Sequence, residues 1–375
     1  MGADSRPIGR TFITLFLIAT LTCLGCGERN PPGHQSYRVS YNPYGSVDWE
    51  ANHRCLTQFH DHVMSASRYE RFLGDYDRAG YDAVSPLHYS GDPSHPQAWR
   101  KRYWPVSQYV PSATSDSVLL ERFQNLQILI PGAEEVGFDH ILSPFLTEYI
   151  EKWEGGNQQH KYPFHYESTQ ACIERIHEMG GLAVIAHPWE RLKHYDSYSG
   201  FQAIEVYSGY SNHKFNTGEQ KDTNAEFLRV WDHLLSTKST KIWGIGVNDW
   251  FGPGREDLRA EYPGDIDSGK TVLLIKEWTL ESLRDSFERG AMFAVKDLGI
   301  EKGDYPHIDS IQVGEHEIRI ESDAEVEWIA GQTIHATGEV FTLKGLPSGM
   351  KTIRAQVRNA TGEVFVQPFT LEASQ

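Results

Sequence analysis

Two histidines, His60 and His62, stand one residue apart in the stretch QFHDHV, at the end of a short run that is typical of a β-strand. Alternate residues of a strand point to the same face, so both imidazoles can converge on one point. Imidazoles that converge in this way are a common part of a metal site. A lone histidine in a strand is more often a hydrogen-bonded core residue, so the pair indicates a metal only if other ligands join it.

Further carboxylates and imidazoles follow apolar runs elsewhere in the chain, namely Glu134, Glu135, His140, His187 and Asp249. The runs LQILIPG, GGLAVIAHP and GIGV before them are typical of buried strands. In α/β folds the functional residues gather at the carboxyl ends of the strands. Solvated surface explains so many like groups at strand ends poorly, so the cluster favours a metal centre.

The elements that must position these residues alternate along the chain. Amphipathic stretches such as RYERFLGDYDRAG and STQACIERIHEMGG precede short apolar runs such as YDAVS and LAVIAHP. This alternation predicts an α/β domain over residues 47–302, built on a parallel sheet that is open or closed into a barrel. Beyond it, short alternating runs such as IDSIQV and EVEWIA predict a small β-sandwich over residues 303–375, with a structural or docking role.

The N-terminal residues are typical of an export signal. Arg6 and Arg10 precede an apolar run that is shorter than a transmembrane helix usually is. The run ends in Leu-Gly-Cys, which resembles a bacterial lipobox, so we expect residues 1–25 to be removed and Cys26 to be lipidated. Cys23 stands where a lipobox usually has leucine, which leaves a plain signal peptide or a retained anchor as alternatives.

The predicted lipidation of Cys26 determines where we expect to find the protein. We expect an exported protein that is anchored to the bacterial envelope, at the outer membrane or facing the periplasm, through Cys26 alone. Residues 26–46 are rich in Gly, Pro, Ser and Asn and lack periodicity, so they predict a flexible tether.

Composition limits the partners. The formal net charge of -16 argues against a nucleic-acid partner, because phosphate binding needs clustered Lys and Arg. With 39% hydrophobic residues, the chain can build a sizeable core. Two cysteines of the mature chain, Cys55 and Cys172, could pair in an oxidising compartment, but buried thiols are the favoured interpretation.

The order of the segments FHDH, GYDAVS, IPGAEE, FDHIL, GGLAVIAHP, IEVYSG, GVND and TLESLRDSFERG resembles the polymerase and histidinol phosphatase (PHP) superfamily of metallohydrolases. Within it the chain is most similar to bacterial carbaryl-hydrolase-like members. The resemblance covers about residues 47 to 300. It implies a distorted (β/α)7 barrel.

Residue by residue, the resemblance implies two divalent metal ions. One would be held by His60, His62, Glu134 and Asp249, and the other by Glu134, His140 and His187, with Glu134 as the bridge. Glu135 is the rival for Glu134, and the spacing after Pro-Gly favours Glu134. A ligand set rich in imidazole suits zinc, manganese or iron better than calcium or magnesium. Two ions that share a carboxylate can lower the pKa of a bound water and clamp the oxygens of a displacement.

The motif positions that the family uses for a third metal are mostly changed. Serines and an arginine follow the paired histidines, Leu87 replaces an aspartate, and Phe251 replaces a histidine. His88 remains as a weak candidate ligand, and we therefore expect two ions. Asp92 or His95, from the irregular loop that follows, could rebuild the third site.

These residues predict a metal-dependent hydrolase that uses a metal-bound hydroxide, with phosphoesters as the favoured substrates. The catalytic residues would be His60, His62, Glu134, His187 and Asp249. The alternatives are a hydrolase of carboxyl or carbamate esters, or a degenerate barrel that serves as a binding or scaffold protein at the cell surface. A scaffold would lose ligands at random, whereas this chain keeps all six.

Loop residues could recognise the substrate, which we expect to be a small anionic molecule or an ester. The long aromatic stretch over residues 88–112 could form a lid over the site or pack as an inert flap. Among the cations near strand ends, four could meet an anionic substrate or could be ordinary solvated charges: Lys193, His194, Lys214 and Arg255.

Overall fold

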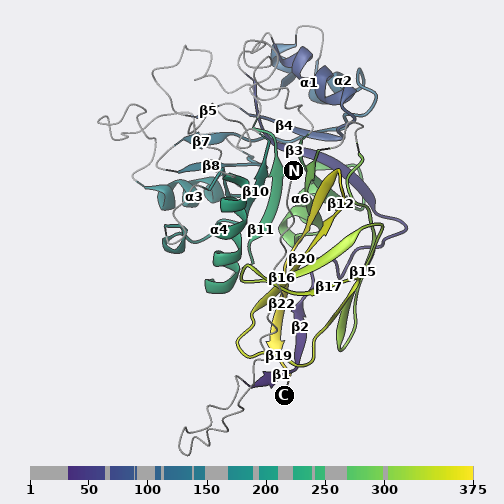
Figure 1. Cartoon of the computed structure of the whole chain (residues 1–375). Coiled ribbons are helices and arrows are strands. Elements are labelled where there is room, and N and C mark those ends of the chain that lie inside the picture. The colour runs from purple at the N-terminus through teal and green to yellow at the C-terminus, as the bar shows by residue number, and fades with distance from the viewer. Residues whose placement is uncertain are drawn as a thin grey trace, which may run out of the picture. The chain divides into compact units, whose positions relative to one another are not determined.

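The structure is a computed structural model that describes residues 33–63, 68–87, 89–90, 106–110, 114–136, 139–147, 168–188, 194–209, 223–238, 241–249, 268–298 and 303–374. Residues His34–Gln375 form one compact unit. The unit is a mixed α/β structure in which strands outnumber helices (Figure 1). Its helices are α1 (Tyr69–Arg78), α2 (Asp116–Leu120), α3 (Thr169–Glu178), α4 (Thr223–Thr237) and α6 (Leu280–Arg289), with short 3-10 turns η3 (Val106–Tyr109) and η4 (Tyr195–Ser197).

The largest sheet runs from the N-terminal part of the unit into the C-terminal strands. Its order is β17-β16-β20-β21-β13-β12-β3-β4-β6, with β2 and β22 attached beside β20. The strands are β2 (Tyr37–Tyr41), β3 (His53–His62), β4 (Ala83–Leu87), β6 (Ile128–Leu129), β12 (Gly269–Ile275), β13 (Met292–Asp297), β16 (Glu325–Ala330), β17 (Thr333–Thr337), β20 (Thr352–Arg358), β21 (Gly362–Val366) and β22 (Phe369–Ala373). Only β3, β4 and β6 are parallel to one another in this sheet.

A second sheet of six strands faces part of the first. Its order is β11-β10-β9-β8-β7-β5, and its strands are β5 (Tyr89–Ser90), β7 (Glu134–Val136), β8 (His140–Leu142), β9 (Val184–Ile185), β10 (Ala203–Ser208) and β11 (Trp243–Val247). Strands β9, β10 and β11 are parallel, whereas β8 is antiparallel to both β7 and β9. The predicted parallel sheet is therefore a mixed one, because the short connection between β7 and β8 permits only an antiparallel pair.

The two sheets approach each other closely where β11 passes β12. The backbone N–H of Gly246 donates to the Thr271 hydroxyl at 3.2 Å, and that hydroxyl donates to the Gly246 carbonyl at 2.9 Å. A Cβ atom at Gly246 would lie 2.5 Å from the Lys270 carbonyl oxygen, so no larger residue fits there. The chain also links the two sheets where β5 follows β4 and where β7 follows β6.

Helices cover the outside of these strands because their sequences are amphipathic. In α1 the buried residues Tyr69, Phe72, Leu73 and Tyr76 recur at the helical spacing of three and four. Thr279 caps the start of helix α6, because its hydroxyl accepts the Ser282 N–H at 3.1 Å, and Gly290, with a φ of 74°, caps its end. Every helix of the described part is too short or too polar to cross a bilayer.

The C-terminal strands form an all-β region. A three-stranded sheet of β14 (Ile308–Val313), β15 (Glu317–Ser322) and β18 (Val340–Thr342) shares a buried core with the large sheet, to which Trp328 and Phe341 contribute stacked rings 5.2 Å apart. Strand β21 pairs with β13, so this region continues the preceding sheet. The division into domains 47–302 and 303–375 stays a prediction.

The sequence predicted a flexible tether over residues 26–46, of which the structure describes residues 33–46, and these differ from a tether. Strand β2 pairs with β22, and β1 (His34–Gln35) pairs with β19 (Leu346–Pro347). Tyr37 and Tyr44 are buried, and the Tyr44 hydroxyl donates to the Met292 carbonyl at 2.9 Å. The alternation of Tyr37, Val39 and Tyr41 supplies an apolar face to a strand, although Gly, Pro and Ser surround it.

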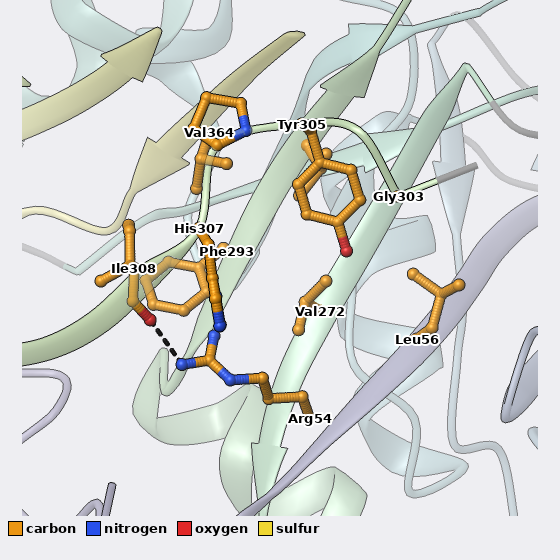
Figure 2. A pocket seen from close by; sticks show the side chains of 11 residues that line it. Arg54, Leu56, Val272, Phe293, Gly303, Tyr305, His307, Ile308 and Val364 are labelled. Carbon is orange, nitrogen blue, oxygen red and sulfur yellow. Dashed lines mark hydrogen bonds between the residues drawn. The ribbon is translucent and has the colours of Figure 1, made fainter. Parts of the chain in front are cut away.

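A cavity of about 190 Å³ lies between β3, β12, β13 and the start of β14 (Figure 2). Arg54 donates to the Ile308 carbonyl at its edge, and apolar side chains such as Val272 and Phe293 line it. The predicted ligands line no part of this cavity. Cys55 and Cys172 are both buried and form no disulfide within the described residues, which confirms the favoured interpretation.

Candidate metal centre

His60 and His62 lie at the carboxyl end of β3, and both side chains are almost completely buried. Their ring centroids are 5.1 Å apart, and both Nε2 atoms face the same two carboxylates. The Gln58 side-chain oxygen accepts the His60 N–H at 3.2 Å, at an irregularity in the pairing of β3 with β4. Strand β3 therefore directs the two imidazoles towards the same point, as their spacing of two residues predicted.

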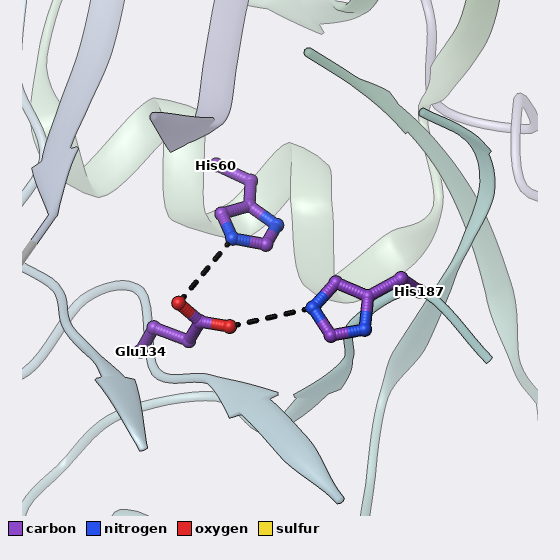
Figure 3. A group of neighbouring side chains, drawn as sticks. All are labelled: His60, Glu134 and His187. Atoms are coloured by element: carbon purple, nitrogen blue, oxygen red, sulfur yellow. Dashed lines mark ion pairs between the residues drawn. The ribbon is translucent and has the colours of Figure 1, made fainter. Parts of the chain in front are cut away.

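Glu134 at the start of β7 lies between two pairs of histidines, and its side chain is 1% exposed. Its Oε2 atom is 3.2 Å from His62 Nε2 and 3.5 Å from His60 Nε2. Its Oε1 atom is 2.6 Å from His140 Nδ1 and 3.5 Å from His187 Nε2. Figure 3 shows His60 and His187 on either side of the carboxylate. Each oxygen thus faces one pair, which is the arrangement that a bridging carboxylate needs.

Asp249 follows β11 and completes the group around the paired histidines. Its Oδ1 atom is 3.3 Å from His60 Nε2 and 3.4 Å from His62 Nε2. The Asp249 N–H donates to the His60 carbonyl at 2.8 Å, which joins the ends of β3 and β11 directly. The end of β11 therefore places a third ligand candidate beside the paired histidines.

Two of the candidate ligands adopt a backbone conformation that few residues other than glycine adopt. The φ angle is 27° at His187 and 56° at Asp249. Such conformations cost of order 1–3 kcal/mol and persist only where the surrounding contacts enforce them, which is typical of functional sites. Both strained positions lie two residues after a strand of the second sheet, His187 after β9 and Asp249 after β11.

The ligand atoms fall into two groups, each within 4.8 Å. One group is His60, Glu134 and His187, and the other is His60, His62 and Asp249. His60 belongs to both groups, whereas the resemblance implied that it serves one ion. His60 Nε2 is buried and makes no hydrogen bond to the described residues, so this donor atom fits a cation. The set of imidazole nitrogens and carboxylate oxygens suits zinc, manganese or iron.

The electrostatics of the cluster also favour cations. Burial by itself lowers the pKa of His60, but Asp249, Glu205 and Glu134 raise it, and the net pKa lies well above the usual value. Burial raises the pKa of Glu134, but His140 and His60 lower it, and the net pKa lies well below the usual value. The carboxylates therefore need positive charge beside them, which either protons on the imidazoles or divalent metal ions can supply.

The structure adds one residue that the sequence analysis missed. Glu205 in the middle of β10 is fully buried, and its Oε1 atom is 2.6 Å from His60 Nδ1. Its Oε2 atom accepts the backbone N–H of His187 at 2.6 Å. A single charged residue inside the apolar run AIEVY was the available signal.

The structure brings together all six ligands that the resemblance implied, and their role as ligands stays a prediction. His88, Phe251, Asp92, His95 and most of residues 88–112 lie outside the described residues, as do the side chain of Glu135 and the cations Lys193, Lys214 and Arg255. His194 is described, and its Nε2 atom is 2.9 Å from the Asp139 carboxylate. This contact gives His194 an internal partner, the residue that precedes His140 in the sequence.

The fold and the cluster define a mixed α/β protein with a candidate centre for divalent metals. No protein-family model matches the chain, and no curated protein matches it. A solved structure from Bacteroides vulgatus, described as a two-domain protein containing a predicted PHP-like metal-dependent phosphoesterase, is similar over 91% of this chain and 99% of that chain. The sequence identity is 16% and the TM-score is 0.44, so the functional argument depends on the chain's own residues.

Proposed function

We propose that this protein is a metal-dependent hydrolase of the PHP superfamily, with phosphoesters as the favoured substrates. The observation that carries the proposal is the position of Glu134, whose two carboxylate oxygens each face a separate pair of imidazoles. In this proposal the strands around the cluster belong to a distorted (β/α)7 barrel. Two divalent ions, zinc, manganese or iron, would be held by the six clustered residues.

When bound, two such ions would supply Lewis acidity for activating a water and for neutralising charge on the substrate. The chain's own residues hold and orient the site. The side chains of His60, His62 and Glu134 are at most 1% exposed, so their positions are fixed by packing. His140 is 33% exposed and His187 13% exposed, so the side of the cluster that they form is the accessible one. A substrate would therefore approach past His140 and His187.

A degenerate barrel that binds rather than hydrolyses is the second candidate. A degenerate site would lose ligands at random, whereas this chain keeps all six candidate ligands, which favours the hydrolase. Carboxyl and carbamate esters remain alternative substrates, because a two-metal site can promote attack at carbon as well as at phosphorus. We further propose an exported protein, anchored to the bacterial envelope through Cys26, that acts on a small anionic or ester substrate.

The test measures hydrolysis by the full chain in detergent, reconstituted with zinc, manganese or ferrous iron. The panel contains p-nitrophenyl phosphate, bis-p-nitrophenyl phosphate, p-nitrophenyl acetate and a naphthyl carbamate. Asp249→Asn is the informative variant, because asparagine tolerates the positive φ at this position better than alanine does. We expect it to lose more than about 100-fold in activity, the upper end for residues that only orient a ligand.

Glu363→Gln is the matched control, because Glu363 is a partly buried carboxylate that pairs with Lys296 and Arg358. It removes one negative charge without touching any clustered residue, so activity should be unchanged. Metal-independent activity, or an Asp249→Asn variant with near-normal turnover, would overturn the proposed function. Activity on the acetate or carbamate alone would replace the phosphoester by the alternative substrate class.

A further inference from the structure

Glu205 is an ionisable side chain in a place where charge is costly. It lies in the centre of β10 between Ile204 and Val206, and none of the three is exposed to solvent. A buried carboxylate is tolerated only where hydrogen bonds or opposite charge compensate it. The contacts of Glu205 therefore show what the chain gains from keeping it.

Both contacts of Glu205 end on residues of the cluster. Oε1 is 2.6 Å from His60 Nδ1, the ring nitrogen that points away from Glu134 and Asp249. Oε2 accepts the backbone N–H of His187, where the φ angle is 27°. A residue that merely filled the core would not need one oxygen on each of two ligand candidates.

We propose that Glu205 is a positioning residue that prepares both parts of the metal centre at once. Through Oε1 it keeps the proton of His60 on Nδ1, so that the lone pair of Nε2 faces the metal position. Through Oε2 it holds the His187 backbone in the strained conformation that turns the ring towards Glu134. This inference rests on the proposed function, because it assumes that the cluster binds metal.

The physical basis is the chemistry of the imidazole ring. A neutral imidazole donates from one nitrogen and accepts at the other, so the partner of Nδ1 decides which nitrogen can bind a metal. Mutation of a residue that orients a metal-binding histidine in this way typically weakens metal binding by about 10–100-fold. The contact with His187 adds a second route by which the same carboxylate supports binding.

Glu205→Gln separates this role from simple packing, because glutamine has nearly the same shape. Only its amide oxygen can accept the His187 N–H, so its NH₂ group must face His60 Nδ1. The NH₂ group donates, which requires Nδ1 to accept and places the His60 proton on Nε2. The variant therefore fills the space but presents the wrong nitrogen of His60 to the metal.

The experiment measures zinc affinity of the full chain in detergent by competition with a chromophoric chelator. We expect Glu205→Gln to bind the more weakly held zinc about 10–100-fold less tightly than the wild type. In zinc-loaded protein, the His60 Nδ1 proton should appear as a slowly exchanging imino resonance that Glu205→Gln lacks. Glu363→Gln again serves as the control, with unchanged affinity and an unchanged resonance.

Each outcome decides between the two proposals. If Glu205→Gln has the same zinc affinity as the wild type and an unchanged His60 resonance, the positioning role is overturned. The proposed function still stands in that case if the wild type binds two ions and hydrolyses an ester. Zinc binding with the expected loss in the variant, but without hydrolysis of any ester, would overturn the function alone. A wild type that takes up no metal would overturn both. The melting temperature of each metal-free variant shows whether the variant folds. If Glu205→Gln does not fold, the shorter Glu205→Asp replaces it in the same measurements.

Discussion

Replacement of the central carboxylate by an amide, Glu134→Gln, should remove about half or more of the stabilisation that metal gives to the folded protein. In the structure, Oε2 of Glu134 faces His60 and His62, and Oε1 faces His140 and His187. Glutamine keeps the volume but has only one oxygen, so its NH₂ group must face one of the two pairs. At most one of the two ions then keeps an oxygen ligand from this residue.

The size of the effect follows from mass action. A metal at 100 times its dissociation constant raises the free energy of unfolding by about 2.7 kcal/mol, so two sites filled to this extent contribute about 5 kcal/mol. The unit His34–Gln375 has about 340 residues, so an unfolding entropy of about 2.1 cal/mol/K per residue makes 1 kcal/mol worth roughly 1.4 °C. Zinc should therefore raise the melting temperature by about 7 °C in the wild type and by about 4 °C or less in Glu134→Gln.

The assay is thermal unfolding of chelator-treated full chain, with and without zinc at a fixed free concentration. Glu363→Gln removes a carboxylate that lies outside the cluster, so it should keep the full increase in melting temperature. The comparison uses the increase within each variant, which cancels any change in the stability of the metal-free form. An increase in Glu134→Gln equal to that of the wild type would refute the bridging position of Glu134.

Mass spectrometry of the mature protein should find residues 1–25 removed and Cys26 lipidated, and an unmodified Cys26 would contradict the anchor. Elemental analysis of protein purified without chelators should find two metals per chain, because Phe251 stands where the resemblance to the PHP superfamily expects a histidine; a third metal lost in His88→Ala would show that a third site exists. Calorimetry in buffers of different ionisation enthalpy should show that metal uptake releases protons, because the pKa values of His60 and His187 are raised in the metal-free protein. Metal affinity should therefore increase as the pH rises from the usual imidazole pKa through these raised values, and an affinity independent of pH over that rise would contradict it. In the metal-free protein the same two groups contribute stability that is fully present below the usual imidazole pKa and is lost as the pH rises through the raised one.

Local patterns in the sequence were sufficient to find the candidate ligands. Alternation in a strand places His60 and His62 on one face, and apolar runs that end in His187 and Asp249 indicate strand ends. The carboxyl ends of parallel strands lie at the same edge of a sheet or barrel, so side chains that follow such strands can meet there. The sequence could therefore predict that these groups gather without showing which strands are neighbours.

Other features depended on contacts between distant parts of the chain. Strand β2 forms because β22, more than 300 residues later, offers it an edge, and the Gly- and Pro-rich surroundings conceal its short apolar alternation. The direction of β8 depends on its short connection from β7, which the spacing of apolar runs does not report. Pairing partners are selected by the whole fold, so local propensity alone cannot predict them.

The sequence by itself determined the chemistry of the candidate centre, because the types of the side chains set which ions they can bind. Only the tertiary structure decided the geometry: Glu134 presents one oxygen to each histidine pair, and His60 belongs to both groups of ligand atoms. It also decided the role of Glu205, which in the sequence is one charge in an apolar strand. The physical reason is that a buried charge acquires its function from the groups that compensate it, and for Glu205 these are His60, 145 residues away, and His187, 18 residues away.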